Sequence, residues 1–283
     1  MKNLIKKSLD CFWSLHRKYI KINLNLKDIH KGETCYIFGN GGSIKYYDLS
    51  IFNDHISIGL THIPIHKQFR QLDMRYIIFA GPYLAYPIAK LYMGSYGDDN
   101  SRFIINYYFR NLWSNIKKNN DNVIFIESLT NLYGMGRTNN TRYYYNDHSE
   151  AALQCDLAGV FNDTNGSLNV SLNLAKYLGF TKTILVGCDY LASPAMVGHF
   201  YSNNDPKFVE TKLEDYIKGI IKSAEGIKVT LLVPEKCHST DFDCITYKEL
   251  FGHTEKLKKN YEIIGNDNLE NLRFLNKKQQ IFL

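Results

Sequence analysis

The stretch that decides the fold is Tyr36–Ser50, YIFGNGGSIKYYDLS. Its first three residues form the apolar end of a short predicted strand, and a Gly-Asn-Gly-Gly-Ser turn follows at Gly39–Ser43. Glycines let a phosphate approach the backbone closely, and the free N–H groups of a following helix attract anions. The spacing matches neither GxGxxG nor the long P-loop. The turn is therefore either a plain tight turn or one wall of a phosphate site.

Six segments rich in Ile, Val and aromatic residues are predicted to be strands. They are Thr34–Phe38, Ile56–Leu60, Arg75–Phe79, Asn122–Ile126, Thr183–Val186 and Ile227–Val233. Segments long enough for a helix lie between several of them, notably Tyr83–Met93, Phe103–Lys118 and Leu168–Leu178. This alternation predicts an α/β, Rossmann-like fold with a mostly parallel sheet and helices on both faces. Ligands of such sheets bind beyond the carboxyl ends of the strands, near a topological switch point.

The composition argues against a disulfide-rich, a membrane-spanning or a nucleic-acid-binding protein. The chain has 283 residues, 45% of them hydrophobic, enough for a substantial core. The six cysteines form no CxxC pair and no signal peptide is apparent, so we expect a reducing, cytoplasmic location without a disulfide framework. No apolar run approaches the roughly 18 to 20 residues of a transmembrane helix. The net charge of +6 is modest, and we expect no nucleic-acid partner.

Residues 1–30 hold seven basic side chains against Asp10 and Asp28. Their apolar positions recur at three- and four-residue spacing, which predicts a basic amphipathic helix. Such a helix either lies peripherally on the anionic surface of the inner membrane or packs on its own domain. We expect a nucleotide-sugar-binding domain over residues 31–250, with a lid or loop around 191–225 and a C-terminal extension over 251–283.

A second segment, residues 164–190, adds two polar turns. The turn Thr164–Ser167 precedes a predicted helix that stops at Gly179, and the next strand ends in Gly187-Cys188-Asp189-Tyr190. Turns of this kind, on either side of one site, can hold a nucleotide between them.

Together these motifs resemble the bacterial sialyltransferases of the Campylobacter type. The shared features are a strand ending in Gly-Asn-Gly-x-Ser, a Thr-x-Gly turn opening a helix that ends in Leu-Gly-Phe, and a strand ending in Gly-x-Asp. The pattern is similar to that of the motility accessory factors, which transfer nonulosonates to flagellin, and of the archaeal hydroxymethylpterin pyrophosphokinase-like proteins. The resemblance covers residues 34–50 and 163–201. It implies one nucleotide-binding domain, a GT-A-like variant of the Rossmann arrangement.

The resemblance also implies which residues contact the donor nucleotide. The matching residues are Gly39, Asn40, Gly41, Ser43, Thr164, Gly166 and Asp189. Four further positions in or near these turns, Gly42, Thr61, Asn165 and Ser167, are also candidates for contact with the donor nucleotide. The chain departs from the family after the second strand, where GLTHIP places Thr61 and His62 near a family asparagine. The family tyrosine after Gly-x-Asp falls at Leu191, one position beyond Tyr190.

Glycosyl transfer from a cytidine-monophosphate (CMP) sugar needs a base for the acceptor hydroxyl and groups that stabilise the departing phosphate. His199 is our first candidate for the base, because histidine titrates near neutrality. Tyr190 and Tyr201 are candidates for phosphate contacts. His238 and His62 also follow predicted strands, so periodicity does not choose among the three histidines.

We expect no cofactor and no metal beyond the CMP-sugar donor. Asp241-Phe242-Asp243 matches the DxD pattern that holds a divalent metal in many nucleotide-sugar transferases. The pattern is short, and a solvated loop is the favoured interpretation.

The sequence thus predicts a glycosyltransferase that moves a sialic-acid-like nonulosonic acid, or a related acidic sugar, from a CMP donor to a surface glycan or glycolipid. One alternative is an ATP-dependent pyrophosphokinase-like enzyme in which Asp189, Asp241 and Asp243 hold magnesium. Another is an inactive nucleotide-binding scaffold. The acceptor, the linkage and the oligomeric state, a homo-oligomer included, are left open.

Overall fold

The computed structural model describes residues 21–79, 101–106, 123–126, 155–158, 161, 166–202, 205–210 and 214–252. Several predictions lie outside these residues: the helix expected before residue 21, the helix Tyr83–Met93, the extension beyond residue 252, and the site residues Thr164 and Asn165. The described part of the N-terminal segment is a 3₁₀ helix, η1 (Lys21–Leu26), followed by turns. The predicted domain limits stay predictions.

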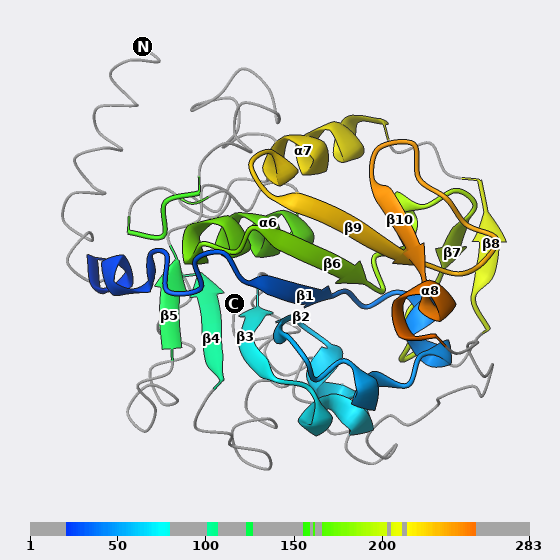
Figure 1. Cartoon of the computed structure of the whole chain (residues 1–283), viewed down its shortest axis with the longest axis horizontal. Coiled ribbons are helices and arrows are strands. Elements are labelled where there is room, and N and C mark those ends of the chain that lie inside the picture. The colour runs from blue at the N-terminus through cyan, green and yellow to red at the C-terminus, as the bar shows by residue number, and fades with distance from the viewer. Residues whose placement is uncertain are drawn as a thin grey trace, which may run out of the picture.

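A parallel sheet forms the centre of the molecule (Figure 1). Its strand order is β10-β9-β6-β1-β2-β3-β4-β5, and every neighbouring pair is parallel. The strands are β1 (Thr34–Phe38), β2 (Ile56–Leu60), β3 (Met74–Phe79), β4 (Arg102–Asn106), β5 (Val123–Ile126), β6 (Lys182–Val186), β9 (Lys228–Val233) and β10 (Asp243–Thr246). The predicted α/β fold class is confirmed, and all six predicted strands are present.

Two strands of the eight-stranded sheet, β4 and β10, were not predicted. The segment Phe103–Lys118, expected to be helical, begins as β4, so this prediction is wrong at its start. Phe103, Ile104 and Ile105 are all buried because β4 lies between β3 and β5 and is covered on both faces. A short continuous apolar run of this kind cannot be told from a buried helix by periodicity. Strand β10 escaped prediction because it is a partly exposed edge strand.

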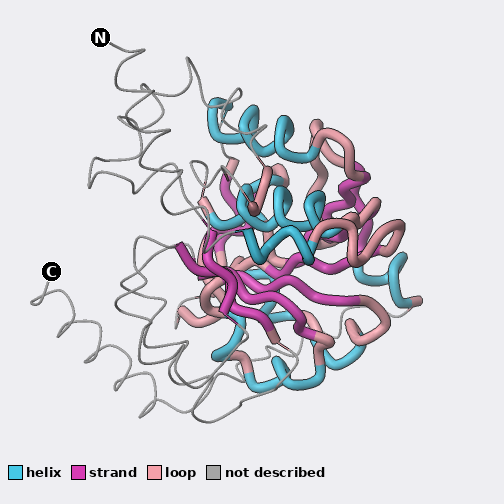
Figure 2. Tube along the Cα trace, turned by 90° about the vertical axis from the view of Figure 1, so that its left-hand side faces the viewer, coloured by secondary structure: helices cyan, strands magenta, loops and turns pink. Residues whose placement is uncertain are grey.

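Helical segments cover both faces of the sheet (Figure 2). Successive side chains of β1 point to opposite faces: Cys35 and Ile37 belong to one apolar cluster, Tyr36 and Phe38 to the other. The first cluster packs under α6 (Ser167–Leu178) and α7 (Glu214–Ala224). The second packs against η2 (Gly42–Tyr46), η3 (Leu49–Ile51), η4 (Ile63–Ile65), η5 (Lys67–Gln71) and α8 (Tyr247–Phe251).

The strand order locates the switch point. From β1 the chain fills one side of the sheet through β2, β3, β4 and β5, then returns to the other side of β1 as β6 and continues through β9 to β10. The connections leaving β1 and β6 therefore diverge, and a crevice is expected beyond their carboxyl ends. Near this edge lie the short η7 (Asp189–Leu191) and an antiparallel ribbon of β7 (Ala195–Val197) and β8 (Lys207–Val209), within the segment predicted as a lid.

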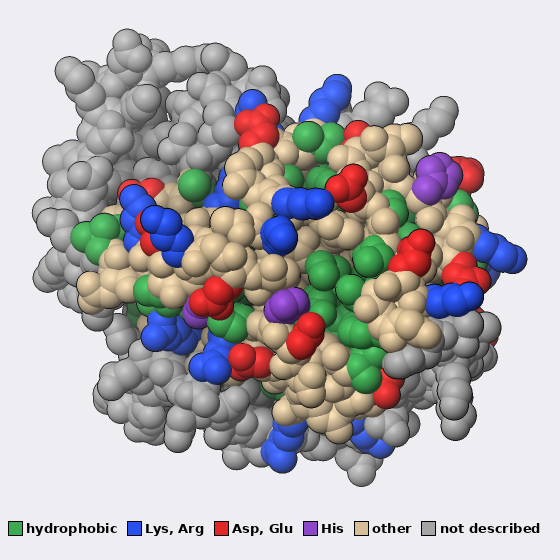
Figure 3. All heavy atoms as spheres, in the orientation of Figure 1, with side chains coloured by type: hydrophobic (Ala, Val, Ile, Leu, Met, Phe, Trp, Pro, Cys, Tyr) green, Lys and Arg blue, Asp and Glu red, His purple; other side chains and the backbone are tan. Residues whose placement is uncertain are grey.

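Charged side chains of both signs are interspersed on the face of the molecule seen in Figure 3. Among the described residues, no helix is both long enough and apolar enough to cross a bilayer.

Candidate active site at the carboxyl edge of the sheet

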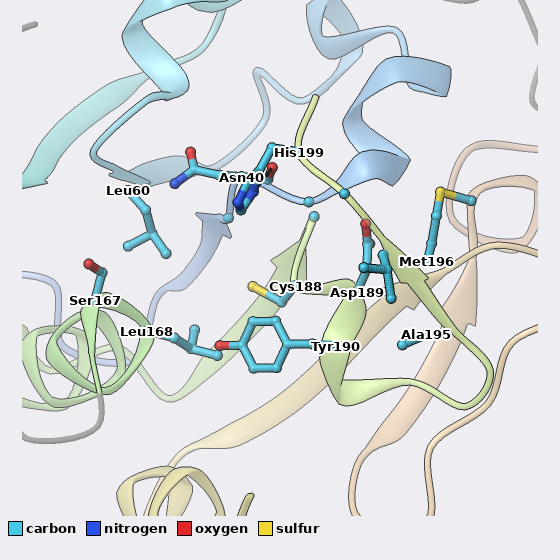
Figure 4. A pocket seen from close by; sticks show the side chains of 15 residues that line it. Asn40, Leu60, Ser167, Leu168, Cys188, Asp189, Tyr190, Ala195, Met196 and His199 are labelled. Atoms are coloured by element: carbon cyan, nitrogen blue, oxygen red, sulfur yellow. Dashed lines mark hydrogen bonds between the residues drawn. The ribbon is translucent and has the colours of Figure 1, made fainter. Parts of the chain in front are cut away.

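A cavity of about 440 Å³ lies at the switch point (Figure 4). Its walls come from the turn after β1, the end of β2, the start of α6, the turn after β6, and the β7 strand with the loop behind it. The lining residues are Gly39, Asn40, Gly41, Leu60, Ser167, Leu168, Gly187, Cys188, Asp189, Tyr190, Ala195, Met196, Val197, Gly198 and His199. The cavity is thus where the topology of a parallel sheet predicts a ligand.

The turns after β1 and β6 are joined through their backbones. The N–H of Gly39 donates to the Val186 carbonyl at 2.7 Å, and the N–H of Gly41 donates to the Gly187 carbonyl at 2.8 Å. A Cβ on Gly39 would lie 2.2 Å from the Gly187 carbonyl oxygen, well inside van der Waals contact. Glycine at position 39 is therefore required for the packing of the two turns, whatever the cavity binds.

Asp189 is held by the second half of the β1 turn. Its Oδ2 accepts from the Ser43 N–H at 2.8 Å, its Oδ1 accepts from the Ser43 hydroxyl at 2.5 Å, and the Gly42 N–H also donates to the carboxylate. Burial raises the pKa of Asp189 to about 6. Gly42 and Ser43 do not line the cavity, so the residues expected to contact a nucleotide here bind Asp189 instead. Asp189 itself lines the cavity.

His199 lies at the cavity, and a backbone carbonyl orients its ring. Its Nδ1 is 3.2 Å from the carbonyl oxygen of Asn40, and the two strands of chain form an isolated antiparallel bridge between Gly41 and His199. A carbonyl oxygen only accepts, so Nδ1 donates in this contact, and in the neutral tautomer that makes it Nε2 has the lone pair. This is the form of imidazole that can accept a proton.

Tyr201 is placed between two histidine rings. Its ring centroid is 4.4 Å from that of His62, with 25° between the planes, and 5.0 Å from that of His199, with 9° between the planes. Burial lowers the pKa of His62 to about 4 and raises that of Tyr201. His62 is therefore neutral near pH 7. The fold brings His62 to His199 and Tyr201, two predicted residues that lie close to each other but far from His62 in the sequence.

Asn40 lines the cavity, and its side chain has one polar atom without a hydrogen-bond partner in the part of the chain that the structure describes. Its Oδ1 is buried and has no hydrogen-bond partner among the described residues. Figure 4 shows the amide turned away from His199. A buried amide oxygen without a partner costs free energy, which a bound donor group would recover.

Of the other predicted residues, Ser167 and Tyr190 line the cavity, whereas His238, Thr61 and Gly166 do not. The backbone of His238 pairs with Ser193, at 2.7 Å and 3.1 Å, and its exposed side chain does not line the cavity. The Thr61 hydroxyl donates to the Ile78 carbonyl at 3.3 Å. Gly166 caps α6 with a φ of 84°, and Ser167 beside it lines the cavity, as does Tyr190.

The DxD segment is also away from the cavity. Asp243 is exposed on β10, 4.0 Å from Lys228. Among the residues that the structure describes, no group of three or more potential metal ligands gathers.

The apolar residues of the cavity wall were not predicted from the sequence. They are Leu60, Leu168, Ala195, Met196 and Val197. The strand prediction alone places Leu60 at the right edge, because it ends β2. The β7 residues gave no signal, since a three-residue strand has no recognisable period.

Known proteins give limited guidance. No family model matches the chain, and no curated protein matches it in sequence. Among solved structures, it is similar to the sialyltransferase CstII from Campylobacter jejuni, determined in complex with a substrate analogue, cytidine-5′-monophosphate. The identity is 14%, the TM-score is 0.40, and the match covers 86% of this chain and 98% of that chain. A match at this level identifies neither a substrate nor a site residue.

Proposed function

We propose that this protein is a glycosyltransferase that moves a nonulosonic acid, or a related acidic sugar, from a CMP-activated donor to a glycan acceptor. The observation that supports this best is the placement of His199 at the switch-point cavity, with its Nδ1 against the Asn40 carbonyl. A cavity at this edge suits a nucleotide, and an oriented neutral imidazole suits removal of a hydroxyl proton.

The donor would occupy the cavity of about 440 Å³, a size within the usual range for small-molecule sites. The main chain of Gly39–Gly41 would face the nucleotide, and the Asn40 Oδ1 would accept a hydrogen bond from it. The phosphate would lie toward Ser167, because α6 begins there and the N-terminus of a helix favours an anion.

In the reaction, Nε2 of His199 would take the proton of the acceptor hydroxyl. The oxygen of that hydroxyl forms a bond to the anomeric carbon of the donor sugar. The bond between that carbon and the phosphate oxygen breaks, and CMP departs with the electron pair. The hydroxyl groups of Tyr190 and Tyr201 are the candidates to stabilise the phosphate. A monophosphate leaving group of this kind needs less help from a divalent metal than a diphosphate does.

Nucleotide binding tests the donor. A ligand that binds only the folded state raises the melting temperature by mass action. We expect stabilisation by CMP that is unchanged by EDTA, and weaker effects of UDP and ATP. Stabilisation by ATP that requires magnesium, with none by CMP, would support the pyrophosphokinase alternative and contradict the proposal. No response to any nucleotide would contradict the proposal, and stabilisation by CMP without transfer would favour the inactive nucleotide-binding scaffold.

Substitution of His199 tests the base. The probe is CMP-N-acetylneuraminate, with released CMP as the measured product. His199→Ala should slow release by about 100-fold or more while leaving stabilisation by CMP intact. The control is His55→Ala, since His55 lies beside the amino end of β2, away from the cavity. Undiminished release by His199→Ala would exclude His199 as the base and make His62 the next candidate.

A further inference from the structure

Lys45 is a buried cation beside the β1 turn. It lies in η2, two residues beyond Ser43, and its side chain is 1% exposed. Burial of an ammonium group is costly unless the group is hydrogen-bonded, and a hydrophobic residue of similar size is often at least as stable in such a place. The Nζ of Lys45 donates to the Ser202 carbonyl at 2.5 Å. The bond links two segments that are far apart in the sequence.

Ser202 ends the short turn that carries His199. The Ser202 N–H donates to the His199 carbonyl at 3.0 Å, which closes the turn, and the Phe200 N–H donates to the Asn40 carbonyl at 3.2 Å. The Asn40 carbonyl therefore receives both the Phe200 N–H and the His199 ring. One end of the turn is fixed by Asn40, and the other end is fixed by Lys45.

The chain beyond this turn also lies on the β1 turn. A Cβ on Gly42 would be 2.6 Å from the Pro206 Cγ, so Pro206 packs directly on Gly42. The segment from His199 to Pro206 thus crosses over Gly41 and Gly42 at both of its ends. Two side-chain hydrogen bonds are described for this crossing: one from Lys45 to the Ser202 carbonyl, and one from the His199 ring to the Asn40 carbonyl.

We propose that Lys45 is a positioning residue, which holds the His199–Ser202 turn over the glycine turn and thereby keeps the imidazole of His199 at the cavity. Loss of the ammonium would release the Ser202 carbonyl, and of its described contacts the turn would keep those with Asn40 and the ring packing of Phe200 and Tyr201. The consequence for catalysis rests on the proposed function of His199. The consequence for the backbone does not.

Amide hydrogen exchange on the full chain tests the positioning directly. In Lys45→Met, the amides of Phe200 and Ser202 should exchange at least about tenfold faster, because a buried hydrogen bond to a charged group is removed. The Ser43 amide, which Asp189 holds, should keep its protection. Lys67→Met is the matched control, since Lys67 is exposed in η5, and its exchange at all three amides should equal that of the wild type.

A second variant covers the case in which Lys45→Met does not fold. Lys45→Gln keeps a hydrogen-bond donor in a neutral side chain. Its exchange rates at Phe200 and Ser202 should lie between the wild-type rates and the rates expected without the hydrogen bond to Ser202. Unchanged exchange at these two amides, or equally faster exchange at Ser43 and throughout β1, would overturn the proposal.

Turnover adds a readout that a purely structural role would not give. With CMP-N-acetylneuraminate as probe, Lys45→Met should release CMP at least about tenfold more slowly while CMP still raises its melting temperature as in the wild type. Faster local exchange without any loss of release would contradict the catalytic consequence. If CMP does not bind the wild type at all, the proposed function fails, and the exchange result still decides the anchoring role of Lys45.

Discussion

The turn after β1 has two halves, Gly39–Gly41 and Gly42–Ser43, which are adjacent in sequence but have different contacts in the structure. Gly39, Asn40 and Gly41 line the cavity. Gly42 and Ser43 are buried behind it, where they donate to Asp189 and pack under Pro206. A motif that looks like a single phosphate loop therefore combines a segment of the cavity wall with an internal brace. Substitution of the closely packed Gly39 or loss of the Asp189 contacts should damage the fold, whereas substitution of the Asn40 side chain should damage binding in the proposed function.

The largest effect is expected at the junction of the two strand ends. In Gly39→Ala, the new Cβ would meet the backbone oxygen of Gly187, which cannot rotate away, so the free energy of unfolding should fall by about 3 kcal/mol. Urea unfolding at equilibrium measures this. The control is Gly226→Ala, where φ is +85° but nothing lies within 4 Å, and the loss should be about 1 kcal/mol. Equal losses in the two variants would show that the turns are not packed as described.

Asp189, which Gly42 and Ser43 hold by hydrogen bonds, should make the free energy of unfolding depend on pH. Burial raises the pKa of Asp189 from the ordinary 3.8 to about 6. A carboxyl whose pKa is higher in the folded state binds more protons there, so its contribution is full below the unfolded pKa and is lost as the pH rises through about 6. Relative to Asp189→Asn, which does not titrate, the wild type should lose up to about 1.4 kcal/mol per pH unit within this window.

Urea unfolding of both proteins at pH 4, 5, 6 and 7 measures the difference. Parallel stability curves would show that Asp189 has the same pKa in the folded and unfolded chain. A difference that grows in favour of the wild type as the pH rises would mean that the three donors outweigh burial.

The smallest effect on the fold is expected at the side chain of Asn40, a residue of the cavity wall. Asn40→Ala should change the free energy of unfolding by less than about 1 kcal/mol, because the Asn40 Oδ1 has no partner in the described structure. Affinity for CMP, measured by titration calorimetry, should fall about tenfold, because the amide is lost as an acceptor. A large loss of stability with unchanged CMP affinity would reverse the roles of the two halves.

How far the sequence predicts this structure depends on the length and exposure of each element. Strands β1 and β2 are found at their predicted limits because each is a short β-branched or aromatic run followed by glycine or a polar turn. Helix α6 is found because its apolar face and the stop at Gly179, which has a φ of 92°, are both local signals. The run in β4 is ambiguous in isolation, and its neighbours on both sides decide its conformation.

In the candidate site, too, features that depend on contacts between distant residues could not be predicted from local sequence signals. The placement of His199 at the cavity could be anticipated only as one of three candidates, because its contact with Asn40 joins residues that are 159 positions apart. The hydrogen bonds from Ser43 to the Asp189 carboxylate could not be predicted. The sequence of a strand-end aspartate does not show whether its side chain contacts a ligand or another part of the chain. The pairing of Tyr201 with His62 depends likewise on tertiary packing.

Amide hydrogen exchange of the wild type with and without saturating CMP tests the central claim most directly. Binding at the switch point predicts added protection in three peptides, which contain Gly39–Gly41, Ser167–Leu168 and Gly187–Tyr190. It predicts no added protection at the opposite edge of the sheet, where Glu33, Asp54 and Asp73 line an acidic hollow. Protection confined to that hollow, or absent from all three peptides, would contradict the assignment of the cavity as the nucleotide site.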